Sequence, residues 1–217
     1  MDRRTFLEST IVLAAASAFP GIALAKDQTA VLPPPNMTGG KPLYEVLAQR
    51  GTARAFAPEA LSAQALSNVL WAAFGVNRPA QGRRTAPSAK NWQEIDVYAA
   101  TADGLHLYEP KGHSLRLIVD KDLRALAGKQ DFVATAPLNL IYVVDTARCD
   151  GAGSADTALL NWADTGFIAQ NVYLACACEG LATVVRANID KPALAEAMKL
   201  TDKQFVTLSQ TVGHPKA

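Results

Sequence analysis

The sequence has few cysteines, no excess of charge of either sign and no long cluster of basic residues. Its 217 residues contain 21 Lys and Arg against 20 Asp and Glu, a formal net charge of +1. This balance gives no sign of a nucleic-acid partner, which would need a basic surface. Three cysteines, Cys149, Cys176 and Cys178, do not make a disulfide framework. They suit a role as small buried apolar residues better than a metal site, because no further ligands lie nearby.

Nucleotide-binding loops and metal-binding histidine patterns are also absent. No G-x-G-x-x-G follows a predicted strand and no G-x-x-x-x-G-K-[ST] occurs, while residues 151–153 (G-A-G) lack the third glycine. A Rossmann or P-loop site is therefore not supported. His106, His113 and His214 are scattered without ligand spacing, and we expect them to be structural or exposed.

The first 25 residues have the organisation of an export signal. Arg3 and Arg4 precede an apolar run at residues 11–18, and A-L-A at residues 23–25 forms a small-residue cleavage site. The adjacent arginines indicate the twin-arginine type, which implies the twin-arginine translocation machinery as a partner and a periplasmic or secreted mature protein. The alternative is an amphipathic N-terminal helix. Pro20 interrupts the apolar run before the roughly 20 residues that a spanning helix needs, so no stable membrane anchor is expected.

Removal of residues 1–25 leaves one domain of ordinary size. Residues 26–41 contain P-P-P and G-G and are predicted to be a linker or N-terminal arm. Residues 42–217 form the predicted folded domain. Strands and helices alternate there without a regular βα repeat. Helices are predicted at residues 42–49, 62–75, 155–179 and 191–200, and strands at residues 94–99, 105–107, 115–117, 138–144, 183–185 and 205–212.

A first cluster of candidate binding residues follows the first predicted helix. Arg50 and Arg54 are four residues apart with the hydroxyl of Thr52 between them. Two guanidinium groups and a hydroxyl suit a phosphate group, since arginine can bind its oxygens through two hydrogen bonds at once. Solvated arginines at a helix end are the alternative.

Two further clusters lie on predicted loops. Ser88 and Asn91, within residues 85–92, place compact donors and acceptors on a proline-shaped loop that could meet the polar edge of a flat ring. A simple turn is the alternative. Gly180, within residues 179–184, allows close approach of the backbone to a ligand. An ordinary helix C-cap explains it equally well.

Taken in order, these segments resemble the nitroreductase family, and most closely its SagB-type branch. The resemblance covers about residues 42–217. The matched residues are Arg50, Thr52, Arg54 and Phe56 for R-x-S-x-[RK]-x-F, Pro87, Ser88, Ala89 and Asn91 for P-S-[AS]-x-N, a buried strand at residues 136–142, Asp164 and Gly166 for D-x-G, Gln170, Asn171 and Leu174 for Q-N-x-x-L, Gly180, Leu181 and Thr183 for G-[LI]-x-[TS], and the terminal residues 212–215. Thr52 replaces the usual serine, and Gly51 replaces a bulkier residue.

The resemblance implies an α+β fold with a central, mostly antiparallel sheet flanked by helices. It also implies a homodimer that binds FMN at the subunit interface, with the loop at residues 87–91 contributed by the partner. Gln130 would approach the flavin ring edge. The FMN-binding residues expected on this basis are Arg50, Gly51, Thr52, Arg54, Pro87, Ser88, Ala89, Asn91, Gln130, Gly180, Leu181 and Gly213.

The implied activity is that of an FMN-dependent oxidoreductase. It would pass electrons in a ping-pong cycle to a small acceptor such as a nitroaromatic or a quinone, or oxidise a small substrate, and no catalytic side chain is required because the flavin does the chemistry. One alternative is an exported flavin protein that relays electrons without a small-molecule substrate. Another is an exported protein that kept the fold and lost the cofactor. NAD(P)H is not expected outside the cytoplasm, so the sequence names neither the electron donor nor the substrate.

Overall fold

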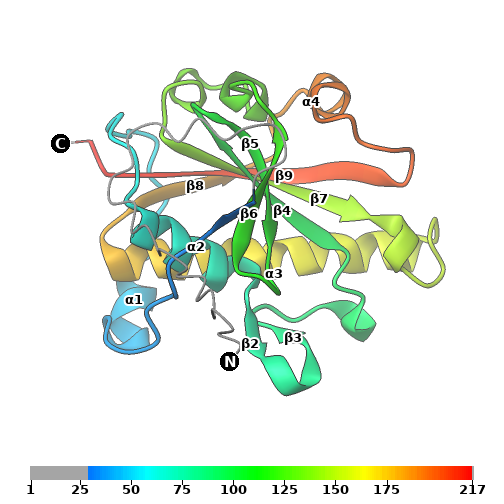
Figure 1. Cartoon of the computed structure of the whole chain (residues 1–217), viewed down its shortest axis with the longest axis horizontal. Helices are drawn as coiled ribbons and strands as arrows, with labels where there is room; N and C mark the ends of the chain where they lie inside the picture. The colour runs from blue at the N-terminus through cyan, green and yellow to red at the C-terminus, as the bar shows by residue number, and fades with distance from the viewer. Residues whose placement is uncertain (1–28, 217) are drawn as a thin grey trace, which may run out of the picture.

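A seven-stranded antiparallel sheet forms the centre of the protein, as a computed structural model shows for residues 29–216 (Figure 1). The strand order is β1-β6-β5-β4-β7-β9-β8. Every pairing in it is antiparallel, which confirms the predicted sheet type. The strands are β1 (Thr29–Val31), β4 (Ile95–Thr101), β5 (Gly104–Glu109), β6 (Ser114–Val119), β7 (Leu138–Asp145), β8 (Ala182–Arg186) and β9 (Gln204–Gly213). The predicted export signal lies outside the described residues.

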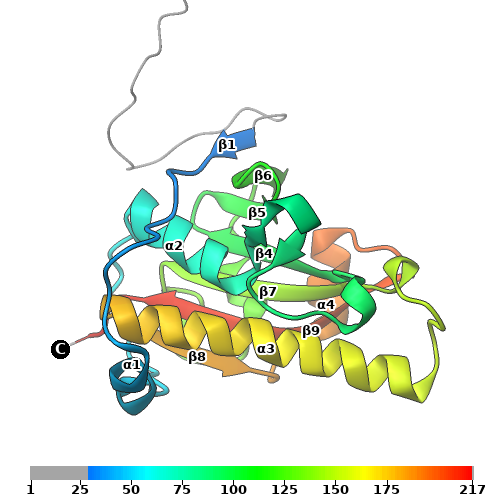
Figure 2. The same ribbon diagram turned by 90° about the horizontal axis from the view of Figure 1, so that it is seen from below.

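Helices cover both faces of this sheet and confirm the α+β fold. They are α1 (Leu43–Gln49), α2 (Ala63–Phe74), α3 (Ala155–Glu179) and α4 (Lys191–Met198). One hydrophobic core lies between the sheet and the helices α2 and α3. The other lies beneath α4 and the short turns at residues 124–127 and 131–133. The helix α1 packs beside the C-terminal half of α3 (Figure 2), and Figure 1 shows it on the side of α3 away from the sheet.

Local capping signals fix the ends of the two long helices. The side chain of Ser62 accepts a hydrogen bond from the amide of Ala65 at the start of α2. Ser154 does the same for Thr157 at the start of α3. The helix α3 ends at Gly180, whose φ of 71° is the left-handed conformation that glycine adopts most easily. The predicted bounds of α3 are confirmed.

The strand β7 runs through the middle of the sheet and is buried on both faces. Leu140 and Tyr142 point into the core beneath α2 and α3, whereas Ile141 and Val143 point into the core beneath α4. This double burial explains the nearly unbroken apolar run that predicted the strand.

Two segments differ from the sequence-based expectation. Part of the N-terminal arm forms the edge strand β1, in which Ala30 pairs with Leu115 of β6. The predicted polar loop after α2 contains a small hairpin of β2 (Val76–Arg78) and β3 (Arg83–Arg84). Both are very short, and their pairing depends on a partner strand rather than on a periodic pattern of their own. No helix within residues 29–216 has the length and apolar character needed to span a bilayer.

Candidate functional site

Three segments distant in sequence line one cavity of about 220 Å³ near the C-terminal end of α3. Gly51 and Thr52 come from the segment after α1, and Leu181 comes from the turn after α3. A backbone hydrogen bond of 3.0 Å from Ala53 to the carbonyl of Thr183 fastens the first segment to β8. The structure thus brings together residues from the first and third predicted clusters.

Tyr173 of α3 organises this cavity, and the sequence analysis missed it. Its hydroxyl lies 3.1 Å from the Thr52 hydroxyl and accepts a hydrogen bond of 3.0 Å from the amide of Val185. The guanidinium of Arg50 lies over its ring, 5.4 Å from the centroid, a cation–π contact. Tyrosine is common in buried helices, so nothing in the sequence distinguished this residue from an ordinary core residue.

The two predicted phosphate-binding arginines flank the same segment. Arg50 caps the C-terminal end of α1 and is half-buried, whereas Arg54 is exposed. Within residues 29–216 neither forms an ion pair with an Asp or Glu side chain. Guanidinium groups without a carboxylate partner are suited to an anionic ligand, and that of Arg50 lies over Tyr173, which lines the cavity.

The C-terminal segment returns to the segment after α1 and borders the cavity. The amide of Lys216 donates a hydrogen bond of 3.3 Å to the carbonyl of Ala55, and Pro215 lines the cavity. Gly213 permits this path, because a Cβ there would lie 2.9 Å from the ring of Pro137 and 3.3 Å from Phe56. Gly213, one of the expected FMN-binding residues, thus lies beside Phe56 at the end of the arginine segment.

The loop at residues 87–91 does not reach the cavity within one chain. It precedes β4, and the amide of Ala89 donates a hydrogen bond of 2.7 Å to the carboxylate of Asp164 in the N-terminal half of α3. Asp164 and Tyr173 are separated by roughly 14 Å along the helix axis, at 1.5 Å per residue. The first and second clusters are therefore apart in the monomer.

The backbone of this loop is strained. Lys90, Asn91 and Gln93 have φ values of 49°, 58° and 53°, a region that non-glycine residues seldom adopt. Ser88 contributes to holding it, since its hydroxyl accepts a hydrogen bond of 2.8 Å from the amide of Gln93 and donates one of 3.1 Å to Glu94. Such strain persists only where the surroundings enforce it and is concentrated at functional sites.

Two carboxyl groups, which the sequence analysis also missed, lie beneath the loop. Glu94 is wholly buried and Asp164 is 3% exposed. Burial, followed by the neighbouring charge of Asp164, raises the pKa of Glu94 to about 7. Glu94 lies just before the first residue of β4, where Ser88 of the loop and Asp164 of α3 surround its carboxyl group.

The remaining predicted residues lie outside the cavity. Gly180 is exposed, and its left-handed φ accounts for the glycine without a ligand. Gln130 is half-buried near Arg186, and its side-chain oxygen has no hydrogen-bond partner within the described part of the chain. Gln130 precedes Phe132 by two residues, and the ring of Phe132 packs on that of Phe56 with centroids 5.3 Å apart. Phe56 follows Arg54 by two residues, so Gln130 is linked to the arginine segment only through these two rings.

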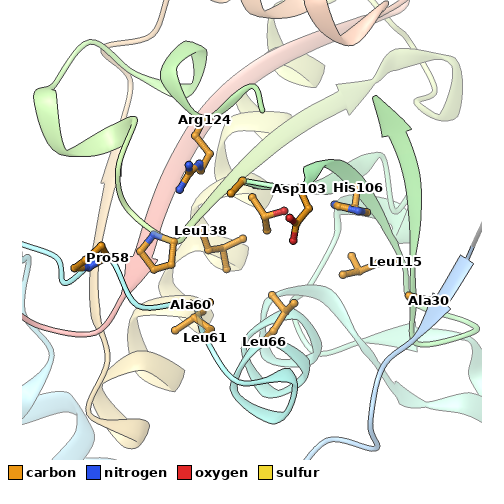
Figure 3. Close-up of a pocket in the computed structure, with 13 residues that line it drawn as sticks. Ala30, Pro58, Ala60, Leu61, Leu66, Asp103, His106, Leu115, Arg124 and Leu138 are labelled. Carbon is orange, nitrogen blue, oxygen red and sulfur yellow. The ribbon is translucent and has the colours of Figure 1, made fainter. Parts of the chain in front are cut away.

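A second cavity, of about 150 Å³, contains none of the predicted residues (Figure 3). Leu66, Leu115 and Leu138 give it an apolar lining, with Asp103 and His106 on one side. Burial lowers the pKa of His106, which favours the neutral imidazole. This cavity lies between β1, the start of α2 and the β4–β5 turn, and is separate from the arginine-flanked cavity.

These features define a class of α+β domain in which three segments meet at one cavity: the segment after α1, the C-terminal end of α3 and the C-terminal segment of the chain. The chain belongs to the Nitroreductase family, whose family model matches residues 47–214. A relative from Methanocaldococcus jannaschii, named "Putative nitroreductase MJ1384", is 30% identical over 181 residues, which cover 79% of this chain and 90% of the relative. Membership of this family identifies the chain as an oxidoreductase.

Solved structures agree with this assignment. The crystal structure of a "putative nitroreductase" from Ralstonia eutropha JMP134 superposes with a TM-score of 0.84 at 39% identity, covering 93% of this chain and 97% of the other. The NADPH:FMN oxidoreductase of Vibrio harveyi, complexed with NAD+, superposes with a TM-score of 0.61 at 20% identity, covering 81% and 69% of the two chains. The second likeness shows the shared fold alone.

Proposed function

We propose that the protein is an FMN-dependent oxidoreductase and that the cavity beside Tyr173 holds the flavin. The observation that carries this proposal is the cavity formed by Gly51, Thr52 and Leu181, with Arg50 over the ring of Tyr173 that lines it and Arg54 on the same segment. Its donor set fits FMN, because free guanidinium groups suit a phosphate while a hydroxyl and backbone groups suit the polar edge of a ring. The Vibrio harveyi neighbour, an NADPH:FMN oxidoreductase by name, supports the choice of flavin.

In this proposal the side chains bind and orient the cofactor. Arg50 and Arg54 hold the phosphate, and Thr52, fixed by Tyr173, offers its hydroxyl to the flavin. When bound, FMN supplies the redox chemistry, taking electrons from a donor and passing them to a small acceptor such as a nitroaromatic or a quinone. An electron relay without a small-molecule substrate is the alternative.

We further propose a homodimer, with α1 and α3 forming the contact. Large apolar side chains are exposed on these helices: Tyr44 is 84% exposed, Leu159 69%, Leu43 60% and Phe167 47%. An exposed apolar surface of this kind is typical of an interface between chains. Such a dimer supplies the loop at residues 87–91 from the partner, which resolves its separation from the cavity within one chain.

We also propose that the protein is exported by the twin-arginine route. A twin-arginine route carries folded proteins, so the flavin would be loaded in the cytoplasm and the mature protein would act in the periplasm or outside the cell. A purified mature chain should therefore carry FMN. Turnover of a nitroarene or a quinone by the dithionite-reduced protein distinguishes the enzyme from the relay, because a relay leaves these acceptors unreduced.

A further inference from the structure

Two buried carboxyl groups lie together beneath the strained loop. Glu94 immediately precedes β4 and Asp164 projects from α3, and the charge of Asp164 adds to burial in raising the pKa of Glu94. Both are shielded from solvent. A buried carboxylate needs a cation or several hydrogen-bond donors, and two of them in contact cannot both be charged without strong repulsion.

No cation neutralises this pair within residues 29–216. Neither carboxyl group takes part in an ion pair. Arg148, on the segment after β7, is engaged elsewhere: its guanidinium lies 2.7 Å from Asp96 and 3.5 Å from Asp145. The pair must therefore reduce its charge by another route.

The other titratable groups near the pair do not provide that route. The Cys149 thiol lies close to both carboxyl groups, but burial raises its pKa to about 11, so it stays neutral and protonated. In the loop itself, the ammonium of Lys90 lies over the ring of Trp92, 5.1 Å from the centroid.

The hydrogen bonds leave one carboxyl oxygen of the pair without a partner. Oε2 of Glu94 accepts from the hydroxyl of Ser88, and Oδ2 of Asp164 accepts from the amide of Ala89. Oε1 of Glu94 is buried and has no partner among the described residues. A proton on this oxygen, donated to Asp164, satisfies it and removes one charge.

We propose that Glu94 and Asp164 share one proton and act as positioning residues that hold the 87–91 loop in its left-handed conformation. Each carboxyl group holds the loop directly, one through Ser88 and the other through Ala89. The consequence for FMN rests on the proposed function, in which this loop meets the flavin of the partner. When the pH rises and the proton leaves, the two charges repel, the loop loosens and FMN binds less tightly.

The proton itself is tested first, on FMN-free protein. Glutamate and aspartate are labelled with ¹³C at their carboxyl groups, and NMR follows a titration from about pH 5 to about pH 9. We expect Glu94 to remain protonated at about pH 6, where exposed glutamates are ionised. The amide resonance of Ala89 should shift along the same curve, and Asp164→Asn should abolish the late titration. A Glu94 that is ionised with the exposed glutamates would overturn the proposal.

The effect on the cofactor is tested with Glu94→Gln, which keeps the size and a hydrogen-bond donor but cannot lose a proton. From about pH 6 to pH 9, FMN affinity of the parent should fall by about ten-fold more than that of this variant. Glu59→Gln, a change at an exposed residue, should behave as the parent. If the NMR titration shows the shared proton but no flavin binds at any pH, the proposed function fails and this inference stands. If FMN binds equally at all pH values and Glu94 is ionised at about pH 6, this inference fails and the proposed function stands.

Discussion

The side chain of Arg50 is positioned by Tyr173, a residue more than one hundred positions away in the sequence. The cation–π contact orients the guanidinium, and the tyrosine hydroxyl joins Thr52 to β8 through the amide of Val185. One side chain of α3 thus sets the positions of two predicted FMN-binding residues.

The first prediction concerns the arginines. Charge-assisted hydrogen bonds to a phosphate contribute about 1.5–3 kcal/mol each, so Arg50→Ala or Arg54→Ala should weaken FMN binding by about ten- to a hundred-fold. Riboflavin, which has no phosphate, should lose much less affinity. Fluorescence titration measures both ligands. Arg116→Ala, on β6 next to the far edge strand β1, serves as the control and should change neither affinity. Unchanged FMN binding in both arginine variants would show that these are ordinary surface charges.

The second prediction concerns the hydroxyl of Tyr173. Tyr173→Phe leaves the amide of Val185 without its acceptor and should lower the free energy of unfolding by about 1–3 kcal/mol. Urea denaturation of the FMN-free protein measures this loss. Tyr44→Phe, at an 84% exposed position, should have no effect. Equal stability of the two variants would mean that the hydroxyl does not organise the cavity.

At the scale of elements, α3 separates two parts of the candidate site. Its C-terminal half borders the arginine-flanked cavity, and its N-terminal half supports the 87–91 loop through Asp164. The N-terminal half of α3 exposes Leu159, Trp162 and Phe167, and α1, which lies beside the other end of α3 (Figure 2), exposes Leu43 and Tyr44. A second copy of the chain on these residues would bring a loop to each cavity.

The third prediction follows from this arrangement. Phe167→Glu places a charge on the exposed side of α3 and should dissociate the proposed dimer, because a charge cannot be buried there without a partner. Light scattering should give about twice the mass of the mature chain for the parent and the single mass for the variant. Val31→Glu, at an exposed apolar residue of the edge strand β1, is the matched control and should remain dimeric. A parent that is monomeric and still binds FMN would contradict the proposed interface.

The elements also show how far the sequence could predict the structure. Ser62 and Gly180 are local signals, so α2 and α3 were predicted at nearly their observed bounds. The strand β1 was not, because its residues pair only once β6 is in place. The arginine segment and the turn at Leu181 were recognised from their motifs, whereas their meeting at Tyr173 is a tertiary contact.

Burial was the other quantity that the sequence could not supply. Glu94 alternates with apolar residues in the pattern of a solvent-facing side chain, yet it is wholly buried. Its environment is created by Ser88 and Asp164, which come from the preceding loop and from α3. Only the folded structure brings these polar groups together.

At the scale of the whole molecule, the proposal joins a flavin domain to an export signal. The fourth prediction tests that signal: replacing Arg3 and Arg4 together with lysine should leave the precursor in the cytoplasm, because the twin-arginine route recognises the arginine pair rather than its charge. Cell fractionation with antibody detection measures the distribution. Undiminished export of the double variant would refute the twin-arginine assignment while leaving the flavin site untouched.

The most direct test of the central claim is the visible absorption spectrum of the purified mature chain, followed by release and mass analysis of any bound cofactor. We predict a flavin spectrum and FMN released at about one molecule per chain, since a homodimer of this arrangement has two equivalent cavities. Protein purified without colour should regain the spectrum when FMN is added. A colourless chain that binds no FMN on titration would contradict the account and identify a member of the family that kept the fold without the cofactor.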